Sequence, residues 1–94
     1  MELIFEWHEA KSKENLRKHN ISFDQAKSVF SDPFLLTFPD AGHSEMEERF
    51  VNIGRSPKGN VLIVIHTERE ESIRIISCRK ATASECKIYE EGES

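Results

Sequence analysis

The run Val61-Leu62-Ile63-Val64-Ile65-His66 is the key to the architecture of this chain, because its first five residues form the longest unbroken apolar stretch. Half-buried strands alternate apolar and polar residues, whereas a continuous apolar run is typical of a strand covered on both faces. Residues 61–66 are therefore predicted to be the central strand of a sheet. The run is far shorter than the roughly 20 apolar residues that a membrane-spanning helix needs, so no membrane partner is expected.

Other extended segments lie on both sides of this strand in the sequence. Residues 49–54 alternate apolar and polar positions, and residues 34–38 are apolar. Residues 72–79 are predicted to place Ile73, Ile75 and Ser77 on one face and Arg74, Ile76 and Cys78 on the other. Because short polar links join the last three segments, an antiparallel meander is favoured. Residues 3–7 are expected to form a short strand or an extended arm.

Two helices are predicted between residues 9 and 32. Residues 9–19 are mostly good helix formers, and the Asn20 that follows them suits the left-handed position after a helix. Ser22 and Gln25 form a capping box for a second helix, which Pro33 should end near residue 32. The first third of the chain is therefore predicted to be a helical hairpin.

A short final helix is expected at residues 83–91, capped by Thr82 or Ser84. The helices precede and follow the strands rather than alternating with them, which favours an α+β fold over a parallel α/β fold. The predicted fold is an N-terminal helical hairpin packed on a four-stranded, mainly antiparallel sheet with a short C-terminal helix. Residues 1–94 are expected to form one domain, since typical domains have about 100–200 residues.

The charge distribution limits the possible partners. The net charge of −4 argues against a protein that coats nucleic acid through its overall field. Residues 51–84 nevertheless carry six Lys and Arg against three Asp and Glu, so a local basic site is possible. No secretory signal is visible, and a cytoplasmic location is expected. Cys78 and Cys86 fit no metal-binding spacing, and neither a metal nor another cofactor is expected.

Phosphate-loop, zinc-protease and α/β-hydrolase motifs are missing from the sequence. What remains is a set of polar residues at strand ends and on the last helix: Arg49, His66, Arg74, Arg79, Lys80 and Tyr89. Cleavage of a phosphodiester without a metal needs a base, an acid, and cations for the crowded phosphate. Arginine suits the phosphate because its planar fork matches two oxygens, and histidine titrates near neutral pH.

Each of these residues also has a simpler structural interpretation. His66 suits a core position, and Arg74 suits an ion pair with a neighbouring glutamate. Tyr89 and Trp7 are ordinary packing residues with a polar tip. Arg79 and Lys80 together can be a solvated strand end. The ribonuclease hypothesis requires these side chains to lie around one phosphate. Their spacing in the sequence does not show whether they are close in space, so it does not decide between the interpretations.

Six short segments and two single residues, spread in order over nearly the whole chain, together form a recognisable pattern. The matching segments, in order, are Phe5-Glu6-Trp7-His8-Glu9-Ala10-Lys11, Asn15-Leu16-Arg17-Lys18-His19-Asn20-Ile21-Ser22-Phe23-Asp24-Gln25-Ala26, Asp32-Pro33, His43-Ser44-Glu45, Glu48-Arg49-Phe50-Val51-Asn52-Ile53-Gly54-Arg55-Ser56 and Ile75-Ile76-Ser77-Cys78-Arg79-Lys80-Ala81-Thr82, followed by Glu85 and Tyr89. Through these segments the chain resembles the BrnT family of small toxins. Three positions depart from the family pattern, namely His8, Asn20 and Cys78, and none of them removes an expected catalytic group.

The resemblance implies a RelE-like fold and a metal-independent endoribonuclease of a type II toxin-antitoxin system, which cuts RNA and inhibits translation. The implied partner is a BrnA-type antitoxin with a ribbon-helix-helix domain. The toxin would contact DNA only through this antitoxin. The family motif positions fall on Trp7, Lys11, His19, Arg49, Arg79 and Tyr89, with Glu48, His66 and Arg74 as further members.

The roles expected from this resemblance divide into catalysis and RNA binding. Arg79 and Arg49, together with Arg74, would hold the scissile phosphate. Either His66 or His19 would be the base or acid. Tyr89 would stack on a nucleobase or donate a proton. The expected RNA contacts are Trp7, Lys11, His19 and Lys80. The alternative function is a non-catalytic module that binds the antitoxin and acts as a co-repressor.

Overall fold

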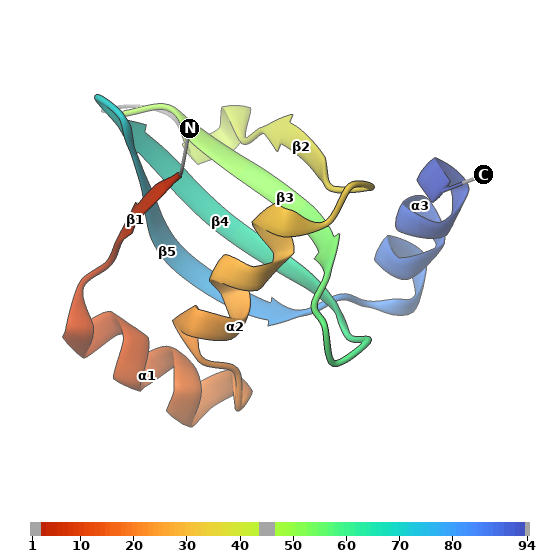
Figure 1. Ribbon diagram of the computed structural model, residues 1–94, viewed down its shortest axis with the longest axis horizontal. Helices are drawn as coiled ribbons and strands as arrows, with labels where there is room; N and C mark the ends of the chain where they lie inside the picture. Colours follow the sequence, from red (N-terminus) through yellow and green to blue (C-terminus); the bar gives the residue numbers. More distant parts are fainter. Residues whose placement is uncertain (1–2, 44–46, 94) are drawn as a thin grey trace.

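The strand β4 (Val61–Arg69) is the centre of the sheet, as its apolar run predicts. The computed structural model describes residues 3–43 and 47–93. β3 (Arg49–Arg55) and β5 (Ser72–Lys80) flank β4 in antiparallel orientation, and β2 (Leu36–Pro39) pairs antiparallel with β3. Figure 1 shows the resulting α+β arrangement, in which the helices lie on both sides of one twisted sheet.

The sheet has five strands rather than the four predicted. β1 (Ile4–Glu6) pairs with β5 in parallel, which gives the order β1-β5-β4-β3-β2. Three residues are too few to show the alternation of apolar and polar side chains that marks a strand. Whether this segment forms a strand or an extended arm therefore depends on whether a strand edge lies near enough to pair with it. The open edge of β5 supplies that partner over its first three residues, Ser72 to Arg74.

Two helices cover one face of the sheet, but they do not form the simple hairpin that was predicted. α1 (Glu9–His19) and the short α2 (Phe23–Ser28) both lie against β5, and a 3-10 turn (Val29–Ser31) continues α2 (Figure 1). Asn20 adopts the expected left-handed conformation with φ 58°, and Ser22 accepts the backbone N–H of Gln25. No described helix has the length and apolar composition that crossing a membrane requires.

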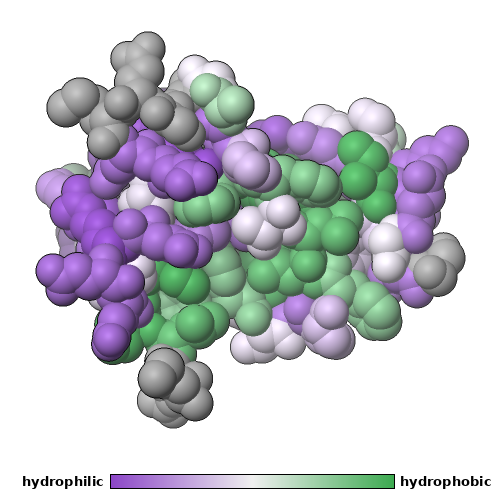
Figure 2. All heavy atoms as spheres, turned by 90° about the horizontal axis from the view of Figure 1, so that it is seen from above, coloured by the Kyte–Doolittle hydropathy of each residue, from purple (hydrophilic) through white to green (hydrophobic). Residues whose placement is uncertain are grey.

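α3 (Ala83–Glu93) lies on the opposite face and covers only one end of it (Figure 1). The core under α1 and α2 contains Phe23, Val64 and Ile75, whereas the smaller core under α3 contains Ile53, Ile63 and Tyr89. No α-helix among the described residues covers the rest of the α3 side of the sheet, and we call this part the open face. Figure 2 shows hydrophobic side chains over the middle of the molecule, with hydrophilic ones at both ends.

A β-bulge in β5 changes which residues share a face. Ser77 lies opposite Ile65, and Ile75 lies opposite His66, so Ile76 is an extra residue in β5. The predicted alternation is therefore correct up to residue 75 and wrong beyond it. After the bulge, Cys78 joins Ile75 under the helices, and Ser77 joins Arg74 on the open face.

A second consequence of the bulge concerns two arginines. Arg74 and Arg79 are separated by an odd number of positions, so a regular strand would point them to opposite faces. The extra residue restores the same phase, and both side chains stand on the open face. The family-matching residues Ser44 and Glu45 lie outside the described residues.

Candidate functional site

A groove of about 320 Å³ lies on the open face beside the start of α3. Its floor is apolar, and its rim carries three groups that can bind or move protons and phosphates. The lining residues are Val51, Ile63, Ile65, Ser77, Cys78, His19, Arg79 and Glu85. A smaller groove of about 200 Å³ adjoins it at the edge of β5 and shares His19 and Ser77. Lys11 and Lys18 line this second groove, so cations from α1 extend the polar rim.

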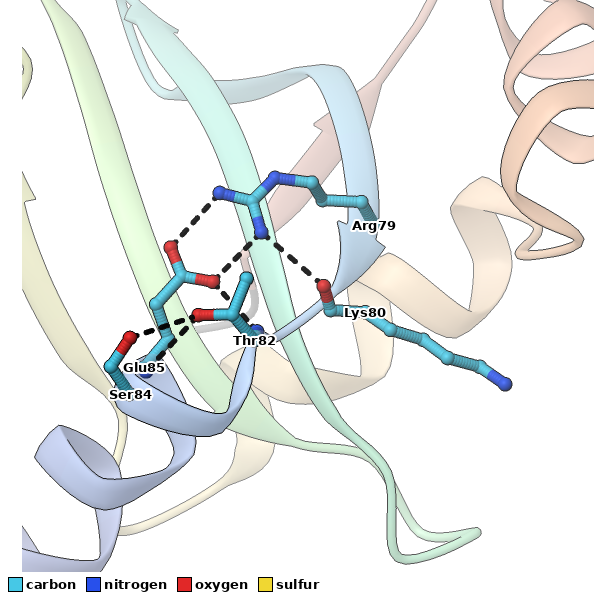
Figure 3. Close-up of polar contacts among 5 residues, drawn as sticks. All are labelled: Arg79, Lys80, Thr82, Ser84 and Glu85. Carbon is cyan, nitrogen blue, oxygen red and sulfur yellow. Dashed lines mark hydrogen bonds and ion pairs between the residues drawn. The ribbon is translucent and has the colours of Figure 1, made fainter.

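Arg79 is held by Glu85 through two parallel hydrogen bonds (Figure 3). Its Nη1 donates to Glu85 Oε1 at 2.8 Å and its Nη2 donates to Glu85 Oε2 at 2.9 Å. Glu85 is fixed in turn by the start of α3, because its carboxylate accepts the backbone N–H of Thr82 at 2.8 Å. Thr82 reciprocates by accepting the backbone N–H of Glu85 at 3.3 Å, which completes a capping box.

The hydrogen bonds from Arg79 lower the pKa of Glu85 from its ordinary 4.5 to about 2, against the opposing effect of burial. Glu85 is thus a carboxylate at neutral pH and a poor proton acceptor. Arg79 also donates Nη1–H to the carbonyl of Lys80 at 3.3 Å. Among the described residues these contacts use three of its five donors. The Nε–H and the second Nη2–H form a free edge that suits two phosphate oxygens.

Two further arginines lie at the other end of the open face. Arg49 on β3 and Arg74 on β5 are both directly opposite Thr67 on β4, so the three residues form one row across the sheet. Arg74 donates to Glu6 at 3.2 Å. Thr67 is fully buried, and its hydroxyl has no hydrogen-bond partner in the described structure.

His66 lies on the helix-covered face and is only 2% exposed. Its ring stacks on Phe50 and meets the edge of Phe30. Asn52 Nδ2 lies 2.6 Å from Nδ1, and Glu68 Oε2 lies 3.2 Å from Nε2. Because the Asn52 amide donates, Nδ1 accepts and the proton is on Nε2. His66 therefore does not face the groove, and the structure does not bring it together with Arg79.

Tyr89 is also buried, and its hydroxyl donates to Asp32 Oδ2 at 2.5 Å. Burial, followed by the neighbouring Asp32 carboxylate, raises the pKa of Tyr89 to about 12. The guanidinium of Arg55 lies 5.3 Å from the centre of the Tyr89 ring and covers it. Tyr89 thus fastens α3 to the sheet rather than lining the groove.

The remaining predicted RNA contacts divide between the grooves and other surfaces. Lys11 and His19 line the grooves described above, while Trp7 packs its ring edge-on against Phe23. Lys80 points away from the Arg79–Glu85 pair, as Figure 3 shows. Glu48 is exposed next to β3. The five residues proposed for catalysis therefore occupy four separate places, and a single phosphate cannot touch all of them. Arg79 lies at the groove, Arg49 and Arg74 lie beside Thr67, His66 lies under the helices, and Tyr89 is buried against Asp32.

Asn15 is a structural residue that sequence reasoning missed. It is buried, donates from Nδ2 to the carbonyls of Ile21 at 3.0 Å and Cys78 at 2.9 Å, and accepts the Cys78 N–H at 3.0 Å. It thereby takes the place of a neighbouring strand at the open edge of β5. An asparagine inside a helix, one turn before the helix ends, was the available signal.

The described residues contain no group of three or more His, Cys, Asp or Glu side chains placed to share a metal ion. Both cysteines are free, and burial raises the pKa of the Cys78 thiol to about 12. A thiolate nucleophile is therefore not among the chemical groups of this groove. Its reactive inventory is a guanidinium, an imidazole and a carboxylate.

Comparisons with known proteins give a family for the sequence and a similar fold among solved structures. A family model described as the ribonuclease toxin BrnT of type II toxin-antitoxin systems matches residues 7–85. The crystal structure of the Brucella abortus ribonuclease toxin BrnT is similar in fold, with a TM-score of 0.67 and 23% sequence identity. That likeness covers 86% of this chain and 99% of the Brucella chain. No curated protein sequence matches.

Proposed function

Because this chain belongs to the BrnT family of ribonuclease toxins of type II toxin-antitoxin systems, we propose that it cuts RNA in the groove beside Arg79. The observation that carries the proposal is the free edge of Arg79, which Glu85 holds at the rim of a groove that His19 also lines. A phosphate bound at this edge would meet both a fixed cation and an imidazole.

The reaction that fits these groups is transfer of the phosphate to the neighbouring 2′-hydroxyl. His19 takes the proton of the 2′-hydroxyl, the 2′-oxygen attacks phosphorus, and the bond to the 5′-oxygen breaks. The leaving 5′-oxygen takes a proton from water, and His19 then gives its proton to the hydroxide that remains. The products are a 2′,3′-cyclic phosphate and a 5′-hydroxyl, and His19 returns to its starting state. Arg79 stabilises the extra negative charge on the phosphate during the attack. In this scheme the guanidinium supplies the positive charge, and no metal ion is required.

The partner expected from the family is a BrnA-type antitoxin with a ribbon-helix-helix domain. In this proposal the antitoxin blocks RNA cleavage, and the complex binds DNA only through the antitoxin. RNA cleavage by the free toxin in the cytoplasm inhibits translation. Family membership supports this part of the proposal, since type II systems pair a protein toxin with a protein antitoxin.

Cleavage of total RNA by the purified chain tests the proposal. We expect cutting that persists in EDTA, is lost in Arg79→Ala, and falls at least about 100-fold in His19→Gln, the loss expected for a general acid-base group. Lys58→Ala, in the turn between β3 and β4, removes a positive charge outside the groove and should cut normally. Intact RNA combined with tight antitoxin binding would instead support the non-catalytic module.

A further inference from the structure

The groove beside Arg79 has an apolar floor that the proposed reaction does not use. Val51, Ile65 and Ser77 lie directly opposite one another on three neighbouring strands, so they form one row across the open face. Because neighbouring strands are about 4.8 Å apart, the row is about 10 Å long. All three residues line the groove and are half-buried, so a ligand can reach each of them. The row is apolar at one end and carries a hydroxyl at the other.

Ser77 is the polar group of this floor. The bulge in β5 places it on the open face, where it lines both the larger groove and the adjoining one. Among the described residues, no side-chain hydrogen bond occupies its hydroxyl. A serine hydroxyl can donate one hydrogen bond and accept others. Ser77 is therefore available to a ligand that lies on the floor.

The floor adjoins the place where the proposed function puts the scissile phosphate. Arg79 comes two residues after Ser77 on β5, on the same face and about 7 Å further along the strand. The Glu85 carboxylate at the same rim is paired with Arg79 through two hydrogen bonds, so it leaves the floor free of an unpaired negative charge. A nucleoside joined to a phosphate at Arg79 is therefore within reach of the floor.

The aromatic residues that the family resemblance offers for base contacts do not face this groove. Tyr89 is only 1% exposed, and Arg55 covers its ring. Trp7 packs against the core under α1 and α2. Neither ring is available to a base that adjoins a phosphate at Arg79. Among the residues that line the groove, the floor is therefore the surface on which such a base can lie.

A nucleobase matches this floor in chemistry and in size. Every base has a face that can lie on an apolar surface and an edge that carries hydrogen-bond donors and acceptors. The face fits Val51 and Ile65, and the edge fits the Ser77 hydroxyl. The groove volume of about 320 Å³ is at the lower end of the range of about 300–1,000 Å³ that is typical of small-molecule sites, so it suits one base rather than several.

We propose that the groove floor holds one nucleobase, which adjoins the phosphate at Arg79, and that Ser77 determines which base is preferred there. This inference deepens the proposed function and rests on it for the RNA class of the ligand. The base packs its face on Val51 and Ile65, and its edge forms a hydrogen bond with the Ser77 hydroxyl. Because the four bases differ along their edges, RNA with the base that pairs best is cut fastest. In this arrangement Ser77 determines specificity and takes no part in bond breaking.

Sequencing the ends of cleaved RNA tests the role of Ser77. At one of the two positions next to the cut, we expect the wild type to prefer one base by about tenfold, the size of one hydrogen bond. Ser77→Ala removes the hydroxyl and leaves the floor in place, so the preference should shrink to within about threefold. Ser72→Ala makes the same change on β5 outside the groove and should keep the wild-type preference. A wild type that cuts all bases alike, or a Ser77→Ala protein with the wild-type preference, would overturn the inference.

Binding of uncleavable RNA tests the floor apart from catalysis. The probes are fluorescent 2′-O-methyl hexanucleotides that carry one A, C, G or U on an otherwise abasic backbone, or no base at all. Measured by anisotropy, the preferred base should bind about tenfold more tightly than the abasic probe, because one base covers the apolar floor. In Ser77→Ala the four bases should bind within about threefold of one another.

Filling the floor provides a second test of the same site. Ser77→Leu should reduce the affinity of every base-containing probe to that of the abasic probe. Ser72→Leu makes the same change on the same strand outside the groove and should bind like the wild type. Thermal denaturation checks that each variant is folded. Equal affinity for abasic and base-containing probes in the wild type, or an equal loss in the Ser72→Leu protein, would contradict the proposed base site.

The two kinds of experiment separate this inference from the proposed function. If the protein binds the base-containing probes as described but never cuts RNA, the proposed function fails and the base site stands. If it cuts RNA with no base preference in the wild type, the inference fails and the proposed function stands.

Discussion

Asn15 ties α1 to the edge of the sheet through both ends of its side-chain amide. Replacing it with alanine leaves the N–H and carbonyl of Cys78 and the carbonyl of Ile21 without these partners in a buried place. Each unsatisfied buried group costs about 1–3 kcal/mol. We therefore expect Asn15→Ala to lower the free energy of unfolding by about 2–4 kcal/mol, as measured by urea denaturation.

The control for this change is Leu16→Ala, at an exposed position next in the same helix. Its effect should stay near 0.5 kcal/mol, roughly the range of surface substitutions. An Asn15→Ala protein as stable as the Leu16→Ala protein would show that water replaces the amide without cost. Asn15 would then have no special structural role, as the sequence analysis of this helix assumed.

Single residues were predictable where the chemistry is local. Asn20 and Ser22 act within one turn of their own helix ends, and the structure confirms both roles. His66 shows the opposite case, because its place depends on which face of β4 the helices cover. Its apolar strand has no polar alternation that would separate the two faces. The face of the sheet on which the His66 imidazole lies could therefore be known only from the three-dimensional packing.

At the scale of elements, the Arg79–Glu85 pair joins the end of β5 to the start of α3. The pKa of Glu85 is about 2 in the folded chain, below its ordinary 4.5. A lowered carboxyl pKa adds stability above pH 4.5, and this gain disappears as the pH falls from 4.5 towards 2. We expect Glu85→Gln to lower the melting temperature at neutral pH and to match the wild type near pH 2.

The measurement is the difference in melting temperature between the two proteins across this pH range. Glu91→Gln changes an exposed carboxylate on the same helix and should give no difference that tracks the same window. A Glu85→Gln effect of equal size at every pH would mean that charge is unimportant in the pair. The hydrogen-bond geometry alone would then hold Arg79.

Tyr89 holds the other side of α3 to the body of the protein. Burial would raise the pKa of Asp32, but hydrogen bonds to its carboxylate lower the pKa below its ordinary value. The donors are the Tyr89 hydroxyl and the backbone N–H groups of Arg55 and Phe34. The acceptor of the Tyr89 hydrogen bond is therefore charged. Hydrogen bonds to charged groups contribute about 1.5–3 kcal/mol. We expect Tyr89→Phe to lose roughly this much stability in thermal denaturation.

RNA cleavage by Tyr89→Phe decides between the structural and the catalytic interpretation. At a temperature where both proteins are folded, the variant should cut RNA at nearly the wild-type rate, because its hydroxyl does not face the groove. Loss of cleavage with unchanged stability would restore the catalytic role expected from the family resemblance. Asp32→Asn gives a second comparison, because it weakens the same hydrogen bond from the other side.

The strands themselves were largely predictable, but the phase of β5 was not. Ile75 and Ile76 are chemically alike, so the sequence contains no mark of the residue at which the alternation slips. The structure shows the slip as a bulge opposite the Ile65–His66 step. Because Arg74 and Arg79 share a face only through this bulge, the composition of the open face could not be read from spacing.

At the scale of the whole molecule, the groove combines segments that are far apart in the chain. His19 comes from α1, Val51 from β3, and Glu85 from α3. The α+β class was predictable because it needs only the order of the elements. The five-stranded sheet and the separation of the predicted catalytic residues into four places were not predictable, because they depend on which strand edges meet and which faces the helices cover.

The charge of the whole molecule makes a final prediction about RNA binding. With a net charge of −4, the overall field of this protein does not attract RNA, so we expect its RNA contacts to be few and close to the groove beside Arg79. For single strands, the logarithm of affinity falls with the logarithm of salt concentration with a slope of about −0.7 per phosphate contact. Two to three contacts give a slope of about −1.4 to −2.1.

Anisotropy titrations measure this slope between about 50 and 300 mM salt, with fluorescent 2′-O-methyl oligonucleotides that lack the 2′-hydroxyl needed for cleavage. Arg79→Ala should make the slope shallower by about 0.7, because one phosphate contact is lost, whereas Lys58→Ala should leave it unchanged. A wild-type slope steeper than about −4 would require six or more contacts. The two grooves offer Arg79, Lys11 and Lys18 as cations, which is fewer than six, so RNA would then have to bind over another surface of the molecule.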